Sequence, residues 1–334
     1  MRLLTLSLIL VVGTSVVWGK VHKFSPEFEA VYREAIRPEV QEATRKGAKA
    51  KIIYRVVDDE GTPITNIMVQ GTWRNDFPRK TWNEAFVTNT NGEFVAKGKV
   101  GGAFGFFVRK EGYYLSSTGL NFHWRGGVSP LVKDGMWQPY GEHRTLVVKR
   151  KKNPVEMSYR HTLSCDVPAT NVWLGLDLES FQWTSPYGSG KHDDMLLRFN
   201  YEMHDKYAEQ WATVDISCTN NPSAGFYMRK QDLYSLFKST YHADTNAVIS
   251  QTCTFRMVFP GKYQYTLGKD DYMVFRTRTK VDEKGNLISA HYGKIYGLWE
   301  FGKGMKVSDI YFNPTSNDTN LEFDPKSDGE VLPR

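Results

Sequence analysis

Four carboxylate residues lie close together in the sequence, on both sides of a glycine-rich turn over residues 187–190. These acids, and the aromatic and histidine residues nearest to them, are Asp177, Glu179, Asp193, Asp194, Trp173, Trp183 and His192. Two carboxylates held roughly 5–10 Å apart can cleave a glycosidic bond, and acids beside Trp and His can also bind a metal ion or a sugar. Asp and Glu next to Gly and Ser are equally ordinary turn residues. The cluster is therefore a candidate site, with no catalytic residue assigned.

A second group of ring-bearing and basic residues lies in the connection from Asn121 to His143. Connections longer than about 12–15 residues without secondary structure are uncommon and often functional. Flat rings beside Arg and His suit the faces of sugars, acidic glycans or a peptide. The alternative is that the tryptophans fold back as a small core under the loop. The candidate ligand-binding residues here are Trp124, Arg125, Trp137, Tyr140 and His143.

Other catalytic and metal motifs fail when they are read residue by residue. No histidine is followed three residues later by Glu, and H-E-x-x-H is absent, so the sequence lacks a zinc-hydrolase signature. The segment 297–303 has the spacing of a phosphate-binding loop, but Gly304 stands where Ser or Thr would bind magnesium. We therefore predict no cofactor and no metal ion, and we favour a protein that is not an enzyme over one that is.

Composition and charge limit the class of protein. A length of 334 residues suggests two domains, and the 18 Tyr, 19 Phe and 9 Trp favour strands and contact surfaces. The net charge of +6 is compatible with acidic polysaccharides or anionic surfaces. No Lys/Arg run is typical of a nucleic-acid-binding arm, so we predict no nucleic acid partner.

The N-terminal residues predict export. Arg2 precedes a short apolar stretch, and residues 1–19 are typical of a cleaved signal peptide. No later stretch reaches the roughly 20 apolar residues of a transmembrane helix. We predict a secreted or periplasmic protein without a transmembrane segment. Residues 20–47 have helical spacing, with a break at Pro38 and an end at Gly47.

Residues 48–150 have the two-residue alternation of short strands, including 52–57, 64–73, 94–100 and 104–108. The turn at 89–92 contains Asn-Gly, the strongest short hairpin signal. The stretches "VVDDEGTPITNIMVQGTW", "TNTNGEF" and "VRKEGYY" resemble the carboxypeptidase-regulatory-like, or transthyretin-like, β-sandwich domain. The residues that match its turn motifs are Asp58, Gly61, Pro63, Thr88, Gly92, Phe94, Lys110, Gly112 and Tyr113. This resemblance implies a compact, non-catalytic module that presents loops.

Residues 155–334 are also patterned as strands, with one helix predicted over 230–241. Alternation places Cys165, Cys218 and Cys253 inward, either as buried thiols or as one disulfide and a free thiol. A basic face is expected if the strands that carry the outward cations are neighbours. These cations are Arg198, Arg256, Arg276, Arg278 and Lys280.

The whole chain is similar to a group of exported bacterial two-domain proteins whose activity is not established, on "DLESFQWTSPYGSGKHDD", "GNLISAHYGKIYG" and the final block. We predict an all-β fold of two antiparallel β-sandwich domains behind a short helical segment. The predicted function is an exported, non-catalytic binding or surface-structural protein, with a polysaccharide or cell-surface component as its partner. The alternative is a polysaccharide-active hydrolase that uses the carboxylates of the second domain.

Overall fold

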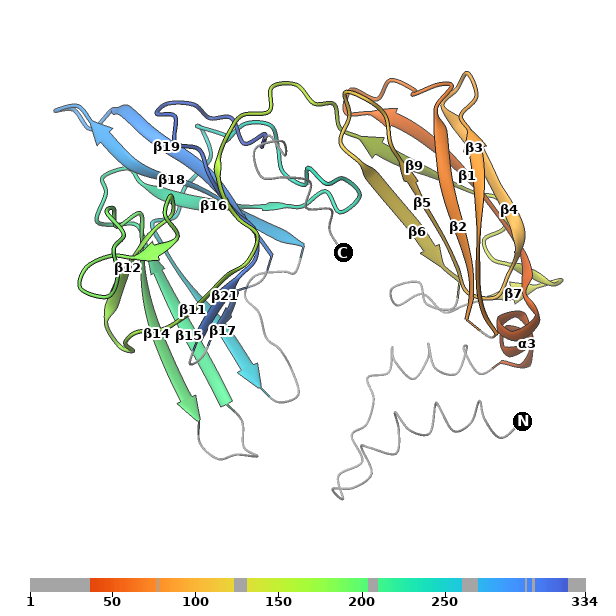
Figure 1. The fold of residues 1–334 in the computed structure, drawn as a ribbon, viewed down its shortest axis with the longest axis horizontal. Helices are drawn as coiled ribbons and strands as arrows, with labels where there is room; N and C mark the ends of the chain where they lie inside the picture. The colour runs from red at the N-terminus through yellow and green to blue at the C-terminus, as the bar shows by residue number, and fades with distance from the viewer. Residues whose placement is uncertain are drawn as a thin grey trace. The chain divides into compact units, whose positions relative to one another are not determined.

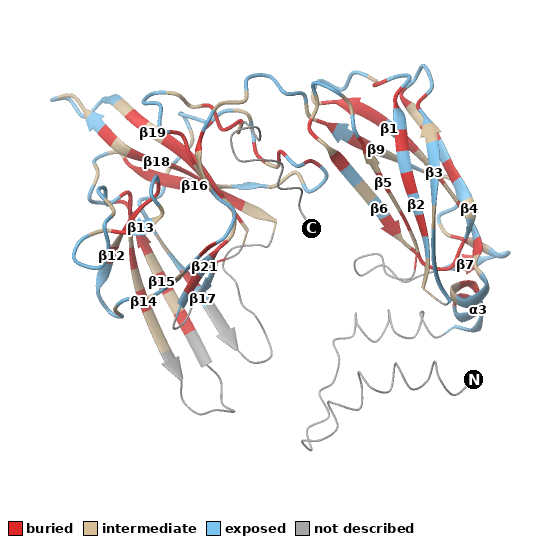
Figure 2. Ribbon diagram, viewed as in Figure 1, coloured by how far each residue is buried: buried red, intermediate tan, exposed pale blue. Residues whose placement is uncertain are grey.

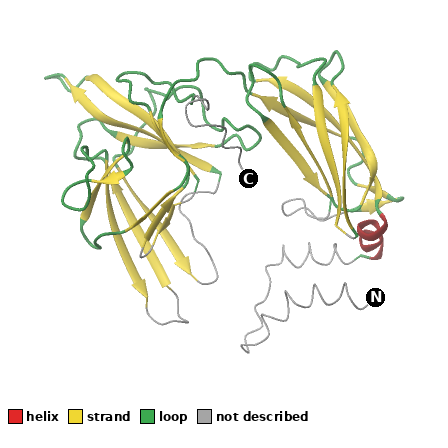
Figure 3. Cartoon of the chain, viewed as in Figure 1, coloured by secondary structure: helices red, strands yellow, loops and turns green. Residues whose placement is uncertain are grey.

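The computed structural model describes residues 37–76, 78–122, 131–203, 210–259, 270–297, 299–301 and 304–323. These residues divide into two compact units, one ending at Arg150 and one beginning at Lys151, which we call unit 1 and unit 2. Nearly all regular structure is β-strand (Figures 1 and 3), which confirms the predicted all-β class with a short N-terminal helix. Among the described residues, no helix is long and apolar enough to span a membrane. The predicted signal peptide, residues 1–19, lies outside the described residues.

The described part of the predicted helical segment is helix α3, Pro38–Lys46. Proline begins the helix. The N–H groups of the first turn of a helix have no partner within it, so the N–H that proline lacks costs no hydrogen bond there. Val40 and Ala43 are buried against unit 1, and Gly47 follows the last turn, as the sequence predicted.

Unit 1 is a sandwich of two sheets that share one apolar core. Sheet I orders its strands β4-β1-β8-β7, with β9 also paired to β1, and sheet II orders them β3-β2-β5-β6. The strands of sheet I are β1 Ala48–Asp58, β4 Glu93–Val100, β7 Val132–Lys133, β8 Met136–Trp137 and β9 Glu142–Val148. The strands of sheet II are β2 Met68–Asp76, β3 Arg79–Val87, β5 Ala103–Val108 and β6 Ser116–Asn121. Tyr54 of sheet I meets Phe106 of sheet II with ring centroids 4.5 Å apart.

Two features of unit 1 differ from the simple antiparallel pattern. Strand β9 runs parallel to β1, with Ile52 opposite Glu142 and Asp58 opposite Val148. The turn at 89–92 forms as predicted, with Gly92 at φ 73, but it does not close a hairpin. β3 pairs with β2 and β4 pairs with β1, so the turn carries the chain from one sheet to the other. Turn chemistry is local, whereas the partner of a strand depends on residues far away in the sequence.

Unit 2 contains three sheets around a second core. Sheet III orders its strands β10-β22-β19-β18-β16, sheet IV β13-β12-β14-β15-β17, and sheet V β11-β21-β20. The strands of sheet III are β10 Ser158–Arg160, β16 Gly225–Lys230, β18 Asp271–Val281, β19 Leu287–Tyr296 and β22 Ile310–Phe312. Those of sheet IV are β12 Trp173–Asp177, β13 Gln182–Trp183, β14 Met195–Met203, β15 Gln210–Ser217 and β17 Thr252–Phe259. Those of sheet V are β11 Leu163–Asp166, β20 Trp299–Phe301 and β21 Gly304–Val307.

The inner faces of these sheets carry the apolar residues that alternation predicted. Leu197 and Phe199 of β14 are fully buried in one core with Phe275 of β18, and Figure 2 shows buried residues along these strands. Cys218 is buried, and Cys165 and Cys253 pack partly buried against this core. All three cysteines are free thiols. Burial raises the pKa of Cys218 and of Cys253 to about 12, so neither is a reactive thiolate near neutral pH.

The helix predicted over 230–241 is wrong. This segment is a set of turns, in which the Asp232 N–H donates to the Lys238 carbonyl and the Tyr234 N–H donates to the Asp232 carboxylate. Leu233 and Leu236 are exposed rather than on a buried helix face. Side chains of Asp and Ser that bond to nearby backbone N–H groups compete with the helix, and apolar spacing alone does not reveal that competition.

Candidate functional site

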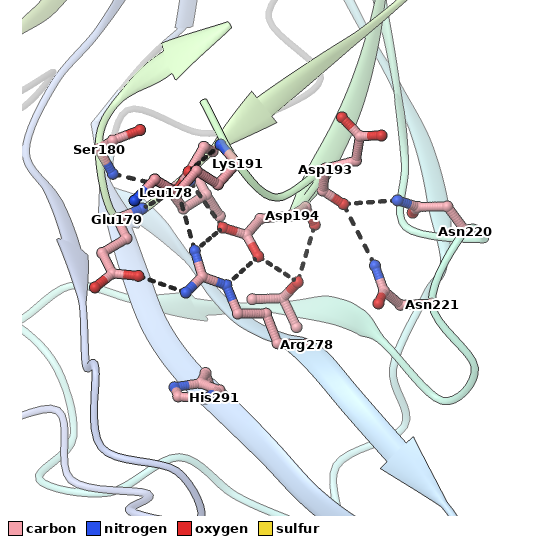
Figure 4. A network of polar contacts seen from close by, with 12 residues as sticks. Leu178, Glu179, Ser180, Lys191, Asp193, Asp194, Asn220, Asn221, Arg278 and His291 are labelled. Carbon is pink, nitrogen blue, oxygen red and sulfur yellow. Dashed lines mark hydrogen bonds and ion pairs between the residues drawn. The ribbon is translucent and has the colours of Figure 1, made fainter. Parts of the chain in front are cut away.

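Three of the four predicted acidic residues meet in space around one arginine from a different sheet. Asp177 ends strand β12, Glu179 follows it, and Asp194 immediately precedes β14. Arg278 comes from β18 of sheet III and points into the space between them (Figure 4). We call Asp177, Glu179, Asp194 and Arg278 the Arg278 cluster.

The geometry of the Arg278 cluster is that of a saturated ion-pair network. The Arg278 guanidinium donates from Nε to Asp194 Oδ1 at 2.9 Å and from Nη2 to Asp194 Oδ2 at 2.9 Å. It also donates from Nη2 to Asp177 Oδ1 at 3.1 Å and from Nη1 to Glu179. Asp194 is buried, and its carboxylate also accepts from the Leu178 N–H and the Thr277 hydroxyl. A side-chain cation of the protein therefore occupies the centre that convergent carboxylates would offer to a metal ion.

The backbone at Arg278 adopts a conformation that suits this role. Arg278 has φ 49, and it lies where the pairing of β18 with β19 shifts register between Thr277 and Lys280. A bulge of this kind re-aims the side chain of a strand residue. The guanidinium also lies 4.5 Å from the centre of the Phe312 ring, a favourable cation–aromatic contact. Arg278 thereby links sheet III to the ends of β12 and β14 in sheet IV.

The protonation of Asp177 follows from these contacts. Burial alone would raise its pKa, but the N–H groups of Lys191, Glu179 and Ser180, followed by the Arg278 charge, outweigh that effect and lower the pKa. Asp177 is therefore ionised at neutral pH. The same network raises the pKa of Arg278 against the effect of its burial. Ionised, fully bonded carboxylates have little capacity to act as general acids.

Asp193, the fourth predicted acid, lies apart from the Arg278 cluster. Its carboxylate accepts from the Thr184 hydroxyl, and its backbone carbonyl accepts from the side-chain amides of Asn220 and Asn221. Figure 4 shows both of these amide contacts. The Asp193–Thr184 contact lies directly over Gly175 of β12, because any side-chain carbon at position 175 would overlap both groups. Asp193 thus lies on the outward side of β12, two residues along the strand from Trp173.

Trp173 begins a row of side chains that crosses four strands on the outer face of sheet IV. Trp173 pairs with Arg198 of β14, Arg198 with Asp215 of β15, and Asp215 with Thr254 of β17. Residues that are directly opposite on neighbouring strands point to the same face. We call these four residues the tryptophan row.

Each member of the tryptophan row contacts the next. The Arg198 guanidinium carbon lies 4.7 Å from the centre of the Trp173 ring. Arg198 donates to Asp215 Oδ2 from Nε at 3.1 Å and from Nη2 at 2.9 Å, and the Thr254 hydroxyl donates to Asp215 Oδ1 at 2.7 Å. Trp173 is 43% exposed, which is unusual for so large an apolar side chain. Asn200 and Thr213 continue the same polar face one row further along the strands.

The five outward cations predicted to form a single basic face do not do so. Arg198 and Arg256 belong to sheet IV, whereas Arg276, Arg278 and Lys280 belong to β18 of sheet III. Arg198 is paired with Asp215 and Arg278 with the acids of its cluster, and Arg276 donates to the Ser223 carbonyl.

The loop candidates of unit 1 fall into three groups. Trp124 and Arg125 lie outside the described residues. Trp137 is 2% exposed, donates from its indole N–H to the Val100 carbonyl at 2.7 Å and stacks on Phe122, so its ring is part of the core. Burial of this ring corrects the expectation that it contacts a ligand, and the fold-back alternative describes it instead.

Tyr140 and His143 remain accessible. Tyr140 is 41% exposed just ahead of β9, and His143 lies on β9 opposite Ile53, on the outward side of sheet I. The structure therefore brings Tyr140 and His143 to sheet I of unit 1. It brings Asp177, Glu179, Asp193 and Asp194 to the end of β12 and the start of β14 in unit 2. Sequence reasoning missed Asp215 and Thr254, whose position on the row depends on strand register.

Comparisons with known proteins give only distant similarity. No protein-family model matches the sequence, and no curated protein matches it. A 3-chlorocatechol 1,2-dioxygenase from Rhodococcus opacus is 14% identical over 31% of this chain and 61% of its own, with a TM-score of 0.25. This chain thus spans less than two thirds of that enzyme.

Two further solved structures cover more of the chain. The major pilin SpaD from Corynebacterium diphtheriae is 9% identical over 79% of this chain and 58% of its own, with a TM-score of 0.23. A candidate carbohydrate-binding protein from Bacteroides uniformis is 8% identical over 79% of this chain and 99% of its own, with a TM-score of 0.19. Similarity this low carries no argument about activity, so the function has to be argued from the site.

Proposed function

We propose that this protein is an exported, non-catalytic binding protein that holds a polysaccharide against the outer face of sheet IV. The observation that carries the proposal is the tryptophan row, an exposed indole continued across the sheet by a bonded Arg, Asp and Thr. Export rests on the N-terminal segment, and a secreted or periplasmic location is part of the same proposal.

The chemistry of the row suits sugar rings. An exposed indole offers a flat apolar surface to the C–H face of a sugar, while its polar edge stays hydrated. Arg, Asp, Asn and Thr side chains supply the donors and acceptors that sugar hydroxyls require. Because Arg198 is held by Trp173 and Asp215 before any ligand binds, less conformational entropy is lost on binding.

The Arg278 cluster holds the strands that carry this face at one end. It fixes the end of β12 and the start of β14, the two strands that carry Trp173 and Arg198. A binding surface needs supporting contacts that hold its residues in place. We therefore assign Asp177, Glu179 and Asp194 a positioning role rather than a catalytic one. Asp193 lies at the margin of the same face.

The hydrolase alternative needs a protonated carboxyl group that can donate a proton. Asp177 has a lowered pKa, and both oxygens of Asp194 accept from Arg278. These contacts favour binding over glycoside cleavage. Tyr140 and His143, together with Trp124 and Arg125, stay candidates for a separate contact in unit 1.

A glycan array and titration calorimetry test the proposal with the purified full chain. Trp173→Ala is expected to weaken binding of the array hit at least tenfold, a loss of about 1.4 kcal/mol. Tyr234→Ala is the matched control, since Tyr234 is an aromatic residue of the same unit that is 50% exposed and lies in the turns after β16 of sheet III. An array without hits, or equal losses in the two variants, contradicts the proposal.

A further inference from the structure

The outer face of sheet I carries a concentration of lysines that the proposed function does not use. Strand β1 places Lys49 and Lys51 on this face, and β4 places Lys97 and Lys99 there. The register sets Lys49 directly opposite Lys99, and Lys51 directly opposite Lys97. Lys133 of β7 extends the first of these rows through Met136, which pairs with Lys49. We call Lys49, Lys51, Lys97, Lys99 and Lys133 the lysine face.

The spacing of these residues makes a regular grid of positive charge. Directly opposite residues have Cβ atoms about 4.5–5.5 Å apart, and alternate residues along one strand lie about 6.6 Å apart. Lys49, Lys97, Lys99 and Lys133 are exposed and Lys51 is half-buried. The grid is therefore accessible to a ligand.

Within the described residues, these ammonium groups are not neutralised by acids. None of the five lysines has a carboxylate within ion-pair distance there. The acids nearest to the grid in register are Glu142, opposite Ile52 and ion-paired with Arg144, Glu93, which pairs with Arg55 further along the strands, and Asp134, in the exposed turn between β7 and β8. Like charges that face each other across strands are unfavourable for folding.

Protection of a sheet edge accounts for only part of this arrangement. Lysines on an edge strand discourage pairing with other chains, and β4 is an edge strand of sheet I. Lys49 and Lys51 lie on β1, which is paired on both sides. Edge protection does not explain lysines at the middle of a sheet, directly opposite other lysines.

We propose that the lysine face binds a linear anionic polysaccharide, whose repeated carboxylate, sulfate or phosphate groups neutralise the grid. A sheet face with charges at regular intervals complements a chain with charges at regular intervals. Single-stranded nucleic acid would favour stacking platforms, and the accessible rings beside the grid are limited to Tyr140 and His143 among the described residues. A membrane surface would favour several large apolar side chains that extend beyond the charges, whereas the exposed apolar residues beside the grid are the short Val95 in the adjacent row and one leucine, Leu131, just before β7.

The test compares dextran sulfate with unsulfated dextran, two probes that share a backbone and differ in charge. Binding of dextran sulfate to the full chain is measured by calorimetry at several salt concentrations. We expect the quadruple variant Lys49→Gln, Lys51→Gln, Lys97→Gln and Lys99→Gln to bind at least tenfold more weakly, with a shallower dependence on salt. Circular dichroism checks that the variant is folded.

A matched quadruple variant changes net charge equally but leaves the lysine face intact. It replaces exposed lysines elsewhere, namely Lys80→Gln, Lys280→Gln, Lys284→Gln and Lys306→Gln. We expect this variant to retain most of the binding. Equal losses in both variants, or equal binding of dextran and dextran sulfate, would overturn the proposal.

Two further binding measurements, with lipid vesicles and with single-stranded DNA, test whether the ligand belongs to another class. Tighter lysine-dependent binding of phosphatidylglycerol vesicles, or of single-stranded DNA, would also overturn the proposal in favour of that partner. Trp173→Ala is expected to leave dextran sulfate binding unchanged, so the two sites succeed or fail independently.

Discussion

The outer faces of sheets I and IV both carry charged residues directly opposite each other on neighbouring strands, but the signs of the facing charges differ. On sheet IV the cation Arg198 faces the anion Asp215 across the strands and is bonded to it. On sheet I the cation Lys51 faces the cation Lys97. Paired charges hold each other in position and leave a nearly neutral surface, whereas unpaired charges repel each other until an external anion arrives. The two proposals therefore assign different ligand chemistry to the two surfaces.

The largest expected effect is the loss of stability on removal of Arg278, whose ion pairs with Asp177 and Asp194 are the most buried charge pairs of this comparison. Arg278→Met leaves Asp177 and Asp194 buried without their cation, so unit 2 should lose about 3–5 kcal/mol of its free energy of unfolding. Hydrogen exchange measured separately on strands of each unit reads this loss, with unit 1 as the internal reference. Arg198→Met, on the exposed pair, should cost no more than about 1 kcal/mol. Similar losses in the two variants would contradict the view that Arg278 is the structural cation.

Acid should weaken the paired network in a predictable direction. The pKa of Asp177 is lowered, since hydrogen bonds and the Arg278 charge outweigh its burial. The pKa of an aspartate in an unfolded chain is about 3.9, so the stability that Asp177 contributes is fully present above that pH. It is lost as the pH falls through the lower native pKa. Urea unfolding between pH 6 and pH 2.5 should show this loss in unit 2.

A matched pair of variants assigns the acid effect to each unit. Asp58 of unit 1 is bonded to Arg150, and its pKa is also lowered against the effect of its burial. Asp177→Asn should reduce the acid dependence of unit 2 alone, and Asp58→Asn that of unit 1 alone. A change in the other unit would show that the transitions are coupled.

The strands and the group of acids could be predicted from the sequence because alternation and turn residues are local patterns. Alternation from Met195 to Phe199 identified the buried face of β14, and the glycine-rich turn placed Asp177 and Asp194 together. Arg278 lies 84 residues after Asp194, and its aim depends on a bulge with φ 49, so no local pattern indicated it as their partner. The predicted hairpin at 89–92 failed for the same reason, because a turn does not choose the partner of a strand.

The lysine face shows where a local signal was present and went unused. The stretches "AKAK" at 48–51 and "AKGK" at 96–99 each place lysines at every second position, which predicts a charged strand face. Only the register of β1 with β4 shows that the two stretches face each other. Alternation gives the direction of a side chain, and pairing gives its neighbour.

A smaller effect is expected from the exposed pair of the tryptophan row. In a double-mutant cycle with Arg198→Gln and Asp215→Asn, the coupling free energy should be about 0.2–1 kcal/mol, because both side chains reach solvent. Thermal unfolding of the four proteins measures it. A coupling free energy near zero would mean that Arg198 is held by Trp173 rather than by Asp215. A second cycle, with Arg198→Gln and Trp173→Ala, should then give a coupling free energy above zero.

The smallest effect separates stability from binding on the lysine face. Lys97→Glu places an anion directly opposite Lys51, so a like-charge pair becomes an opposite-charge pair. Opposite-charge pairs across strands contribute roughly 0.2–1 kcal/mol. The free energy of unfolding of unit 1 should therefore rise by about a few tenths of a kcal/mol. Binding of dextran sulfate should fall at the same time.

Lys80→Glu serves as the control, since Lys80 is exposed on β3 of sheet II, away from the grid. A gain in stability together with a loss of binding is the pattern expected when a surface is arranged for its ligand at the expense of the fold. If Lys97→Glu instead destabilises unit 1, the lysines stabilise the sheet by some other contact and the comparison between the two faces fails.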